Sequence, residues 1–298
     1  MDWDSSFEDF KNYLKLERGL SINSIKSYEY DLNLFRNKIK TNHNSETPIN
    51  WKSDKLKDYQ YNKLSNKKSR SQARSISALK SYFNYLIFEG HIQKSPISDI
   101  ESPKLDKKLP EVLTESEIKK LIESFDLNDN FGQRNRTIIE VLYGTGIRVS
   151  ELINLKLSNI FFKENIMKIT GKGNKERFVP VSNTAKKLLV EYIESIRNFK
   201  KIKKGHEDTL FINNRGQKLT RVMIYTILNN LANHIGLKKK ISPHVLRHSF
   251  ATHLIENGAD IISIQKMMGH ENIVTTEKYL HVKSKHLIDS VLKYHPRS

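Results

Sequence analysis

An arginine and a glutamate near the middle of the chain have the spacing of a site that handles an anion. Arg148 follows the segment GTGI at residues 144–147, at the predicted start of a helix, and Glu151 comes three residues later. Backbone N–H groups at a helix N-terminus favour an anion. A surface ion pair between residues i and i+3, worth about a few tenths of a kcal/mol, explains the same spacing. The spacing alone leaves both interpretations open.

A second group of candidates lies on a helix predicted to begin at Pro243. His244 and Arg247 are three residues apart and share a face, with His248 close by. His253 lies nine residues after His244, so a metal site has to be considered. The chain has no cysteine and no H-E-x-x-H motif, and Arg247 would place a fixed positive charge beside the ion. The residues therefore support a metal site only weakly.

Two further candidates, His270 and Tyr279, come near the C-terminus. His270 follows Gly269, at the end of a helix predicted over residues 260–268. For Tyr279, burial with a bonded hydroxyl is the commoner role of the residue type. The stretch 261–280 also fits a helix-turn-helix DNA reader, because two short helices flank a turn that contains glycine.

The elements that must position these residues begin with a helical N-terminal region. Apolar residues recur at the helical period after Ser21 and Ser24, which are candidate N-caps, at Ile25, Tyr28, Leu32, Phe35 and Ile39. Another helix is predicted over 71–89, with an inward face formed by Ile76, Leu79, Tyr82, Phe83 and Leu86. Its other face could contact DNA phosphates or could be merely solvated, and consists of Arg70, Arg74, Ser77 and Ser81.

The second half is predicted to be a larger, mostly helical domain with a small antiparallel sheet. Residues 94–110 hold three prolines and no periodicity, which is typical of a linker. After it, Thr114 and Glu117 form a capping box. Short β-rich runs at 165–170 and 177–181 predict a hairpin with Lys172 in its turn, and 210–212 is strand-like. We expect a helical domain over 1–93, a linker over 94–110 and a second domain over 111–298, with 282–298 as its tail.

Composition points toward a polyanionic partner. The 298 residues carry a formal charge of +18 and a sequence pI near 9.7, although much of the lysine excess could be solvated surface. No apolar run reaches 18 residues and no leader is recognisable, so we expect a cytoplasmic protein without a membrane segment. The absence of cysteine excludes disulfides and thiolate nucleophiles.

Taken together, the candidate strings resemble the tyrosine recombinases, and specifically their Xer-type members. The matching strings of the second half are GTGIRVSEL (144–152), GKGNKERFVP (171–180), HVLRHSFATHL (244–254), MGHENIVTT (268–276) and YLHV around Tyr279. Two more, ERGLSINSIKSYEYDL (17–32) and LPEVLTESEI (109–118), resemble the Xer core-binding domain, which has a SAM-like fold, and its junction. The resemblance spans nearly the whole chain.

The resemblance implies DNA strand exchange through a 3′-phosphotyrosyl bond, without metal, ATP or another cofactor. The family's catalytic positions fall on Arg148, Lys172, His244, Arg247, His270 and Tyr279. Permanently charged, forked guanidinium groups suit the charge of a phosphorane, with His270 adding a hydrogen bond. Tyr279 is then the nucleophile, His244 the base, and Lys172 the general acid on a hairpin turn. We expect Glu151 to orient Arg148.

The resemblance also implies partners. We expect double-stranded DNA held in a clamp, and a tetramer, of this chain alone or with a second Xer-type recombinase, that passes through a Holliday junction. We expect a housekeeping role in resolving chromosome dimers before cell division, on the nucleoid, with a septal DNA translocase as a candidate activator. The family suggests docking on a neighbouring subunit for the tail residues His286, Leu287, Ile288, Val291 and Leu292, although packing on their own subunit is the alternative.

Other functions remain as competing hypotheses at this point. A phage, transposon or integron integrase would use the same chemistry. A non-catalytic helix-turn-helix protein explains the charge but leaves Arg148, Lys172 and Tyr279 unexplained together. A metal-dependent nuclease using the histidines and a type IB topoisomerase fit the sequence less well.

Overall fold

The computed structural model of the protein describes residues 2–42, 47–49, 69–103, 111–127, 129–269 and 289–297, except for the side chains of 38–42, 130 and 172. The chain divides into two compact units, Met1–Lys108 and Leu109–Ser298. Within the described residues, no helix is long and apolar enough to cross a membrane.

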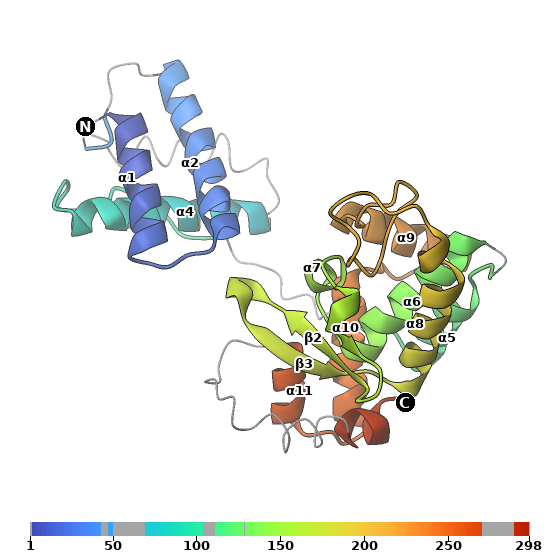
Figure 1. The fold of residues 1–298 in the computed structure, drawn as a ribbon. Coiled ribbons are helices and arrows are strands. Elements are labelled where there is room, and N and C mark those ends of the chain that lie inside the picture. Colours follow the sequence, from blue (N-terminus) through green and yellow to red (C-terminus); the bar gives the residue numbers. More distant parts are fainter. Residues whose placement is uncertain are drawn as a thin grey trace. The chain divides into compact units, whose positions relative to one another are not determined.

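Three helices make up the described part of the first unit: α1 (Trp3–Leu16), α2 (Ile22–Asn42) and α4 (Ser69–Phe88). Helices α1 and α2 lie side by side, and α4 runs across them (Figure 1). Asp2 caps α1 by accepting the backbone N–H of Asp4 at 2.7 Å, and Ser21 caps α2 by accepting that of Ser24 at 3.2 Å. These caps satisfy donors that the first helical turn leaves without an intrahelical partner.

An aromatic cluster forms the core of the first unit. The Tyr82 ring contacts the rings of Phe7 and Phe10, and its hydroxyl lies 2.6 Å from the Ser6 hydroxyl. All inward residues predicted for α4 are buried, which confirms its amphipathic pattern. Ile97 and Ile100 are buried in the same core, so the part of the chain predicted to be a linker from residue 94 begins as packed structure. The isolated apolar side chains that pack there follow no helical period, so the sequence pattern did not predict their burial.

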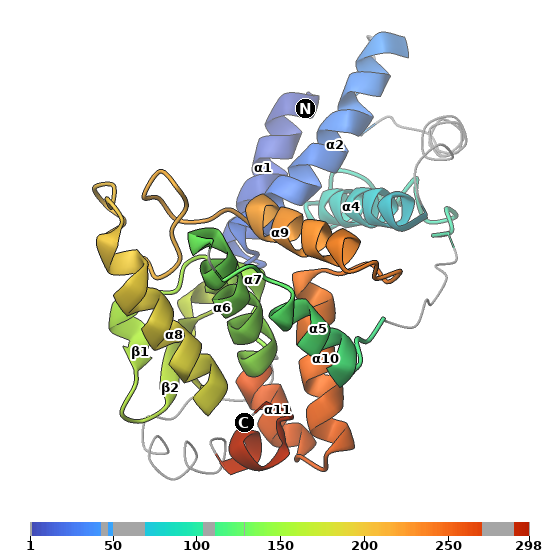
Figure 2. The same cartoon turned by 90° about the vertical axis from the view of Figure 1, so that its right-hand side faces the viewer.

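The second unit holds seven labelled α-helices, short 3-10 turns and a further helical stretch at 289–294 among its described residues. The α-helices are α5 (Glu115–Glu123), α6 (Asn130–Thr145), α7 (Val149–Leu152), α8 (Asn183–Ser195), α9 (Arg221–His234), α10 (Pro243–Glu256) and α11 (Ile261–Met268). The predicted capping box of α5 is present: Glu117 N–H donates to the Thr114 hydroxyl at 3.2 Å, and Thr114 N–H donates to the Glu117 carboxylate at 2.7 Å. Helix α6 packs against both α8 and α10 (Figure 2).

A three-stranded antiparallel sheet, in the order β1-β2-β3, joins this helical unit. Its strands are β1 (Ile160–Phe161), β2 (Ile166–Thr170) and β3 (Glu176–Pro180). The predicted hairpin is confirmed, with Thr170 opposite Glu176, and a short β1 is added at its edge. Gly173 and Asn174 turn the chain between β2 and β3 with φ values of 69° and 61°. The strand predicted at 210–212 is wrong: this buried apolar segment forms only an isolated bridge between Ile212 and Lys218.

The described C-terminal residues pack on their own unit. Val291 is 1% exposed and belongs to the main core, which corrects the expectation that this residue docks on a neighbour. Arg297 donates from Nε to both carboxylate oxygens of Glu140 at 2.9 Å. Leu292 is 38% exposed, and the predicted docking residues 286–288 lie outside the described residues.

Candidate active site

The turn between α6 and α7 fixes the position of Arg148. Helix α6 ends at Gly146, whose φ of 61° lies in the left-handed region. A Cβ at this position would lie 2.4 Å from Cδ1 of Phe250, so glycine is required for close packing as well as for backbone conformation. Two residues later Arg148 is the N-cap of α7, and its backbone N–H donates to Oε2 of Glu151 at 2.8 Å. Its Nη1 donates to Oε1 of the same carboxylate at 3.1 Å.

Arg247 is built into α10 and is almost fully buried. Ser242 caps the helix by accepting the N–H of Val245 at 3.2 Å, and Pro243 occupies the first turn, as predicted. Arg247 is 5% exposed and donates from Nη1 to the carbonyl of Gly146. Burial, and to a smaller extent the nearby positive charge of Arg148, lowers the pKa of Arg247 to about 10. A pKa of about 10 still leaves the guanidinium charged at neutral pH.

A buried carboxylate stands at the centre of the cluster. The Glu151 side chain is 3% exposed and receives a fork from Arg177, with Nη1 to Oε1 at 2.9 Å and Nη2 to Oε2 at 2.8 Å. Burial alone would raise the pKa of Glu151, but the hydrogen bonds and charge of Arg177, together with the bonds from Arg148, outweigh it and lower this pKa. Glu151 is therefore an ionised anchor for two arginines.

The same arginines satisfy the end of α11. The last carbonyls of a helix have no intrahelical partner and form the negative end of its dipole. Three consecutive carbonyls at this end each accept from a different arginine: Arg177 Nε donates to Met267 at 2.8 Å, Arg247 Nη2 to Met268 at 2.6 Å and Arg148 Nη2 to Gly269 at 3.1 Å. The chain leaves this point directly into His270. Three arginines thus fix the segment that delivers a predicted catalytic histidine.

The structure brings together only part of the predicted catalytic set. Arg148, Arg247 and Glu151 form one cluster, whereas His244 is exposed on the first turn of α10. The backbone of Lys172 lies in the turn between β2 and β3, as predicted. The Lys172 side chain, His270, Tyr279 and the second half of the helix-turn-helix candidate lie outside the described residues.

Sequence reasoning missed Arg177. It was grouped with the second strand of the hairpin, and only its charge within an otherwise β-rich run could have marked it. His253, considered as a metal ligand, is instead 5% exposed and has its Nδ1 2.9 Å from the Tyr143 hydroxyl. Among residues that the structure describes, no group of three or more histidine, aspartate or glutamate side chains could hold a metal ion.

The predicted DNA-contacting face of α4 has one anchored member. Arg70, Arg74 and Ser77 are exposed, and Ser81 is half-buried. Arg74 donates from Nε to Oδ2 of Asp31 at 2.8 Å and from Nη2 to Oδ1 at 3.2 Å. Its side chain remains 53% exposed, so the guanidinium is held in one place and still reaches solvent.

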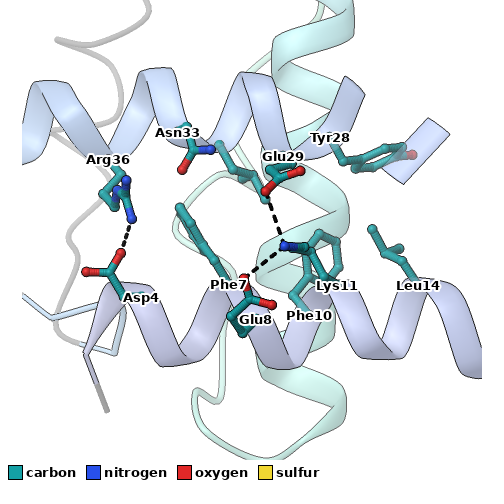
Figure 3. Close-up of a pocket in the computed structure, with 11 residues that line it drawn as sticks. Asp4, Phe7, Glu8, Phe10, Lys11, Leu14, Tyr28, Glu29, Asn33 and Arg36 are labelled. Carbon is teal, nitrogen blue, oxygen red and sulfur yellow. Dashed lines mark hydrogen bonds and ion pairs between the residues drawn. The ribbon is translucent and has the colours of Figure 1, made fainter. Parts of the chain in front are cut away.

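A pocket of about 220 Å³ lies between α1 and α2 of the first unit (Figure 3), and none of the residues predicted for chemistry lines it. Phe7 and Phe10 line it, and ion pairs cross its rim: Arg36 pairs with Asp4, and Lys11 pairs with Glu8 at 2.8 Å and Glu29 at 3.2 Å. Every charge at the rim therefore has a partner within the unit.

Comparison with known proteins places these features in one family. The Phage integrase family profile matches residues 111–286, and the profile of the Phage integrase N-terminal SAM-like domain matches residues 7–90. The chain is 39% identical over 292 residues to tyrosine recombinase XerD of Listeria innocua, covering 98% of both chains. It is 39% identical over 293 residues to tyrosine recombinase XerD of Staphylococcus aureus, again covering 98% of both.

A solved structure agrees with these relatives. The XerH site-specific recombinase, bound to a palindromic difH substrate in a post-cleavage complex, superposes with a TM-score of 0.71 at 25% identity, covering 95% of this chain and 83% of that one. The Tn1549 transposon integrase in complex with circular intermediate DNA gives a TM-score of 0.72 at 20% identity, which shows a shared fold. With the family profile matched over the arginine cluster and the curated relatives matched over almost their full length, the chain belongs to the phage integrase family, as an Xer-type site-specific tyrosine recombinase.

Proposed function

We propose that this recombinase cuts and rejoins double-stranded DNA at a specific site through a 3′-phosphotyrosyl intermediate and a Holliday junction. The observation that carries the proposal is the convergence of Arg148 and Arg247 on the end of α11, one residue before His270. Two fixed positive charges held on the chain segment that leads into a histidine suit a pentacoordinate phosphorane, which carries more negative charge than the diester. Relatives at about 40% identity over 98% of the chain support the same chemistry.

In the proposed step, the Tyr279 oxygen attacks the scissile phosphorus and the bond from phosphorus to the 5′-oxygen breaks. The 3′-phosphate is then joined to tyrosine, and a 5′-hydroxyl is freed. A phenol has a pKa of about 10, so it must lose its proton as it attacks, and His244 accepts that proton. Lys172 donates a proton to the departing oxygen. The phosphodiester energy stays in the new bond, so religation needs no ATP.

The two arginines have different tasks in this proposal. Arg148 is 41% exposed, and its described bonds use two of the five guanidinium N–H groups, so it has donors left for a phosphate oxygen. Arg247 is buried and bound to carbonyls of Gly146 and Met268, so it moves little when DNA binds. A preorganised charge of this kind lowers the barrier because no reorganisation is needed during the reaction.

We further propose the housekeeping role that its XerD-named relatives suggest, the resolution of chromosome dimers before cell division. Exchange of strands between two duplexes needs four subunits, either all of this chain or shared with a second Xer-type recombinase. A septal DNA translocase is the candidate activator. Four subunits on two duplexes would show as a discrete complex whose mass, measured by light scattering, equals four chains plus DNA.

The test of the chemistry uses DNA chosen by the protein itself. Duplexes are selected from a random pool by their binding to the protein, and a nick is placed close to the expected cleavage position. After cleavage, the short fragment with the 5′-hydroxyl diffuses away, so religation cannot occur and the adduct is trapped. Wild-type protein should form a covalent adduct that survives denaturation, and Tyr279→Phe should form none. Tyr225→Phe is the matched control, because Tyr225 is 43% exposed in the same unit and has no proposed role. An adduct that survives in Tyr279→Phe would refute the assignment, whereas Tyr225→Phe should form the adduct as wild type does.

A further inference from the structure

Arg177 makes more directed contacts to the active-site cluster than either predicted catalytic arginine. Its Nε, Nη1 and Nη2 donate to Met267 O, Glu151 Oε1 and Glu151 Oε2, at 2.8, 2.9 and 2.8 Å. All three nitrogens of the guanidinium are thus committed to protein acceptors. The side chain is 14% exposed, whereas Arg148 is 41% exposed. This geometry suits a residue that holds others in place.

Two further close approaches place Arg177 between the segments that carry other predicted catalytic residues. A Cβ on Gly269 would lie 3.2 Å from Cζ of Arg177, so the segment entering His270 runs directly over the guanidinium. A Cβ on Gly171 would lie 3.5 Å from both Nη1 of Arg177 and Oε1 of Glu151, so the chain entering Lys172 passes the same pair. Three segments therefore meet at one side chain: α7, the hairpin turn and the end of α11.

We propose that Arg177 is a positioning residue of the recombinase, which sets the geometry of Arg148 through Glu151 and ties the Lys172 hairpin to the end of α11. The inference rests on the proposed function, since it concerns the rate of that phosphoryl transfer. Arg177 touches neither DNA nor the reacting atoms, because each of its three nitrogens already donates to a protein acceptor and its side chain is only 14% exposed. It acts by holding Glu151 ionised and aligned, and by bonding the carbonyl two residues before Gly269.

Arginine is required for this task because only a planar fork reaches both oxygens of Glu151 while Nε bonds a third acceptor. Lysine keeps the charge but cannot bond both carboxylate oxygens of Glu151 as a fork. In Arg177→Lys, Glu151 should therefore hold Arg148 in a less well defined position. Arg177→Met removes both the charge and the fork. The charged groups that face Glu151 would then be Arg148 from α7 and Arg247 from α10. With one positive partner fewer, Glu151 should take up a proton at a higher pH than in the wild type.

The experiment measures single-turnover adduct formation at saturating DNA, on the nicked duplex described above, from pH 5 to 8. Arg197→Met is the matched control, because Arg197 is 5% exposed and donates from Nε to the carbonyl of Thr209 at 2.9 Å in the same unit, away from Glu151. Thermal unfolding and DNA affinity are measured for each variant. The rates are then expressed per folded, DNA-bound molecule.

We expect adduct formation by Arg177→Met to be about 100-fold slower than by wild type and that by Arg177→Lys about tenfold slower, which is the size of effect that misaligned catalytic groups produce. DNA affinity should change less than about twofold. The rate of Arg177→Met should also fall as the pH is lowered, relative to the wild-type profile, and Glu151→Gln in the same chain should remove that extra dependence. A residue with only a structural role would lower the folded fraction, as we expect of Arg197→Met, and leave the pH profile unchanged.

Two results would overturn the inference and are distinguishable from each other. If wild type and Arg177→Met form adduct at equal rates with parallel pH profiles, the positioning role is wrong and the proposed function stands. If wild type itself forms no adduct on any selected duplex, the proposed function fails and the inference fails with it. If Arg177→Met does not fold, Arg177→Lys decides the question by the same rate and profile.

Discussion

Both units bury a carboxylate beneath an arginine, but the two pairs lead to different parts of the chain. Asp31 of α2 has a side chain 1% exposed and accepts a fork from Arg74 and a bond from the Ser75 hydroxyl at 2.9 Å. Glu151 of α7 has a side chain 3% exposed and accepts a fork from Arg177. In both pairs the carboxylate is buried and accepts two bonds from one guanidinium, although Arg74 is 53% exposed and Arg177 is 14% exposed.

The difference lies in what else each carboxylate holds. Asp31 joins α2 to α4, and both residues that bond it are neighbours on one helix. Glu151 also holds Arg148, and the arginines around it continue to the carbonyls that precede His270. Burial of an ion pair is weak support for stability by itself, because desolvation offsets the attraction. We propose that the Glu151 pair serves the chemistry, because its further bonds lead toward the predicted catalytic residues, whereas the Asp31 pair serves the fold alone.

Neutralising the two carboxylates should separate these roles most sharply. Glu151→Gln leaves Arg148 and Arg177 facing an amide, so we expect a loss of about 3 kcal/mol of unfolding free energy and a roughly 100-fold slower adduct formation per folded molecule. Asp31→Asn should cost a similar free energy of unfolding and leave that rate unchanged. Denaturant unfolding and single-turnover cleavage check both variants. Equal rates of adduct formation for Glu151→Gln and Asp31→Asn would contradict the proposal that only the Glu151 pair serves the chemistry.

Acid should weaken the Glu151 cluster in a defined direction. The pKa of Glu151 is lowered in the folded state, so its ionised form contributes stability that is fully present above the unfolded pKa of about 4.5 and is lost as the pH falls through the lowered folded value. Below pH 4.5, wild type should lose stability more steeply than Glu151→Gln, by at most about 1.4 kcal/mol per pH unit. Unfolding titrations from pH 3 to 6 measure the slopes. Parallel curves would contradict the assignment.

The smallest effect on DNA binding and cleavage per folded molecule is expected at Arg74, the exposed partner of the first pair. Arg74→Gln removes one charge from the proposed phosphate-facing side of α4, so DNA affinity should fall uniformly across sequences. The slope of log affinity against log salt should decrease by about one. Cleavage at saturating DNA should not change. An unchanged salt slope would show that this face is only solvated.

Local signals predicted much of the scaffold. The capping box at Thr114 and Glu117, the start of α10 at Pro243 and the turn holding Lys172 all depend on residues within a few positions of one another. Arg177 could not be found in this way, because it bonds Glu151, 26 residues earlier, and Met267, 90 residues later. The local pattern of a strand does not indicate which distant carboxylate an arginine on that strand will bind.

Predictions for apolar segments without periodicity failed for a related reason. Ile97 and Ile100 were assigned to a linker and residues 210–212 to a strand, yet both segments are buried as irregular chain. Val291 likewise belongs to the core of its own unit. Hydrophobicity indicates that a side chain will be buried, but not which surface buries it.

The most direct test of the central claim is recovery of the DNA covalently bound to this protein, followed by mass spectrometry of the linked peptide. We predict a 3′-phosphate attached to Tyr279, formed in excess chelator and without ATP, and absent from Tyr279→Phe. A phosphopeptide at another residue, or site-specific cleavage without any covalent intermediate, would contradict the account.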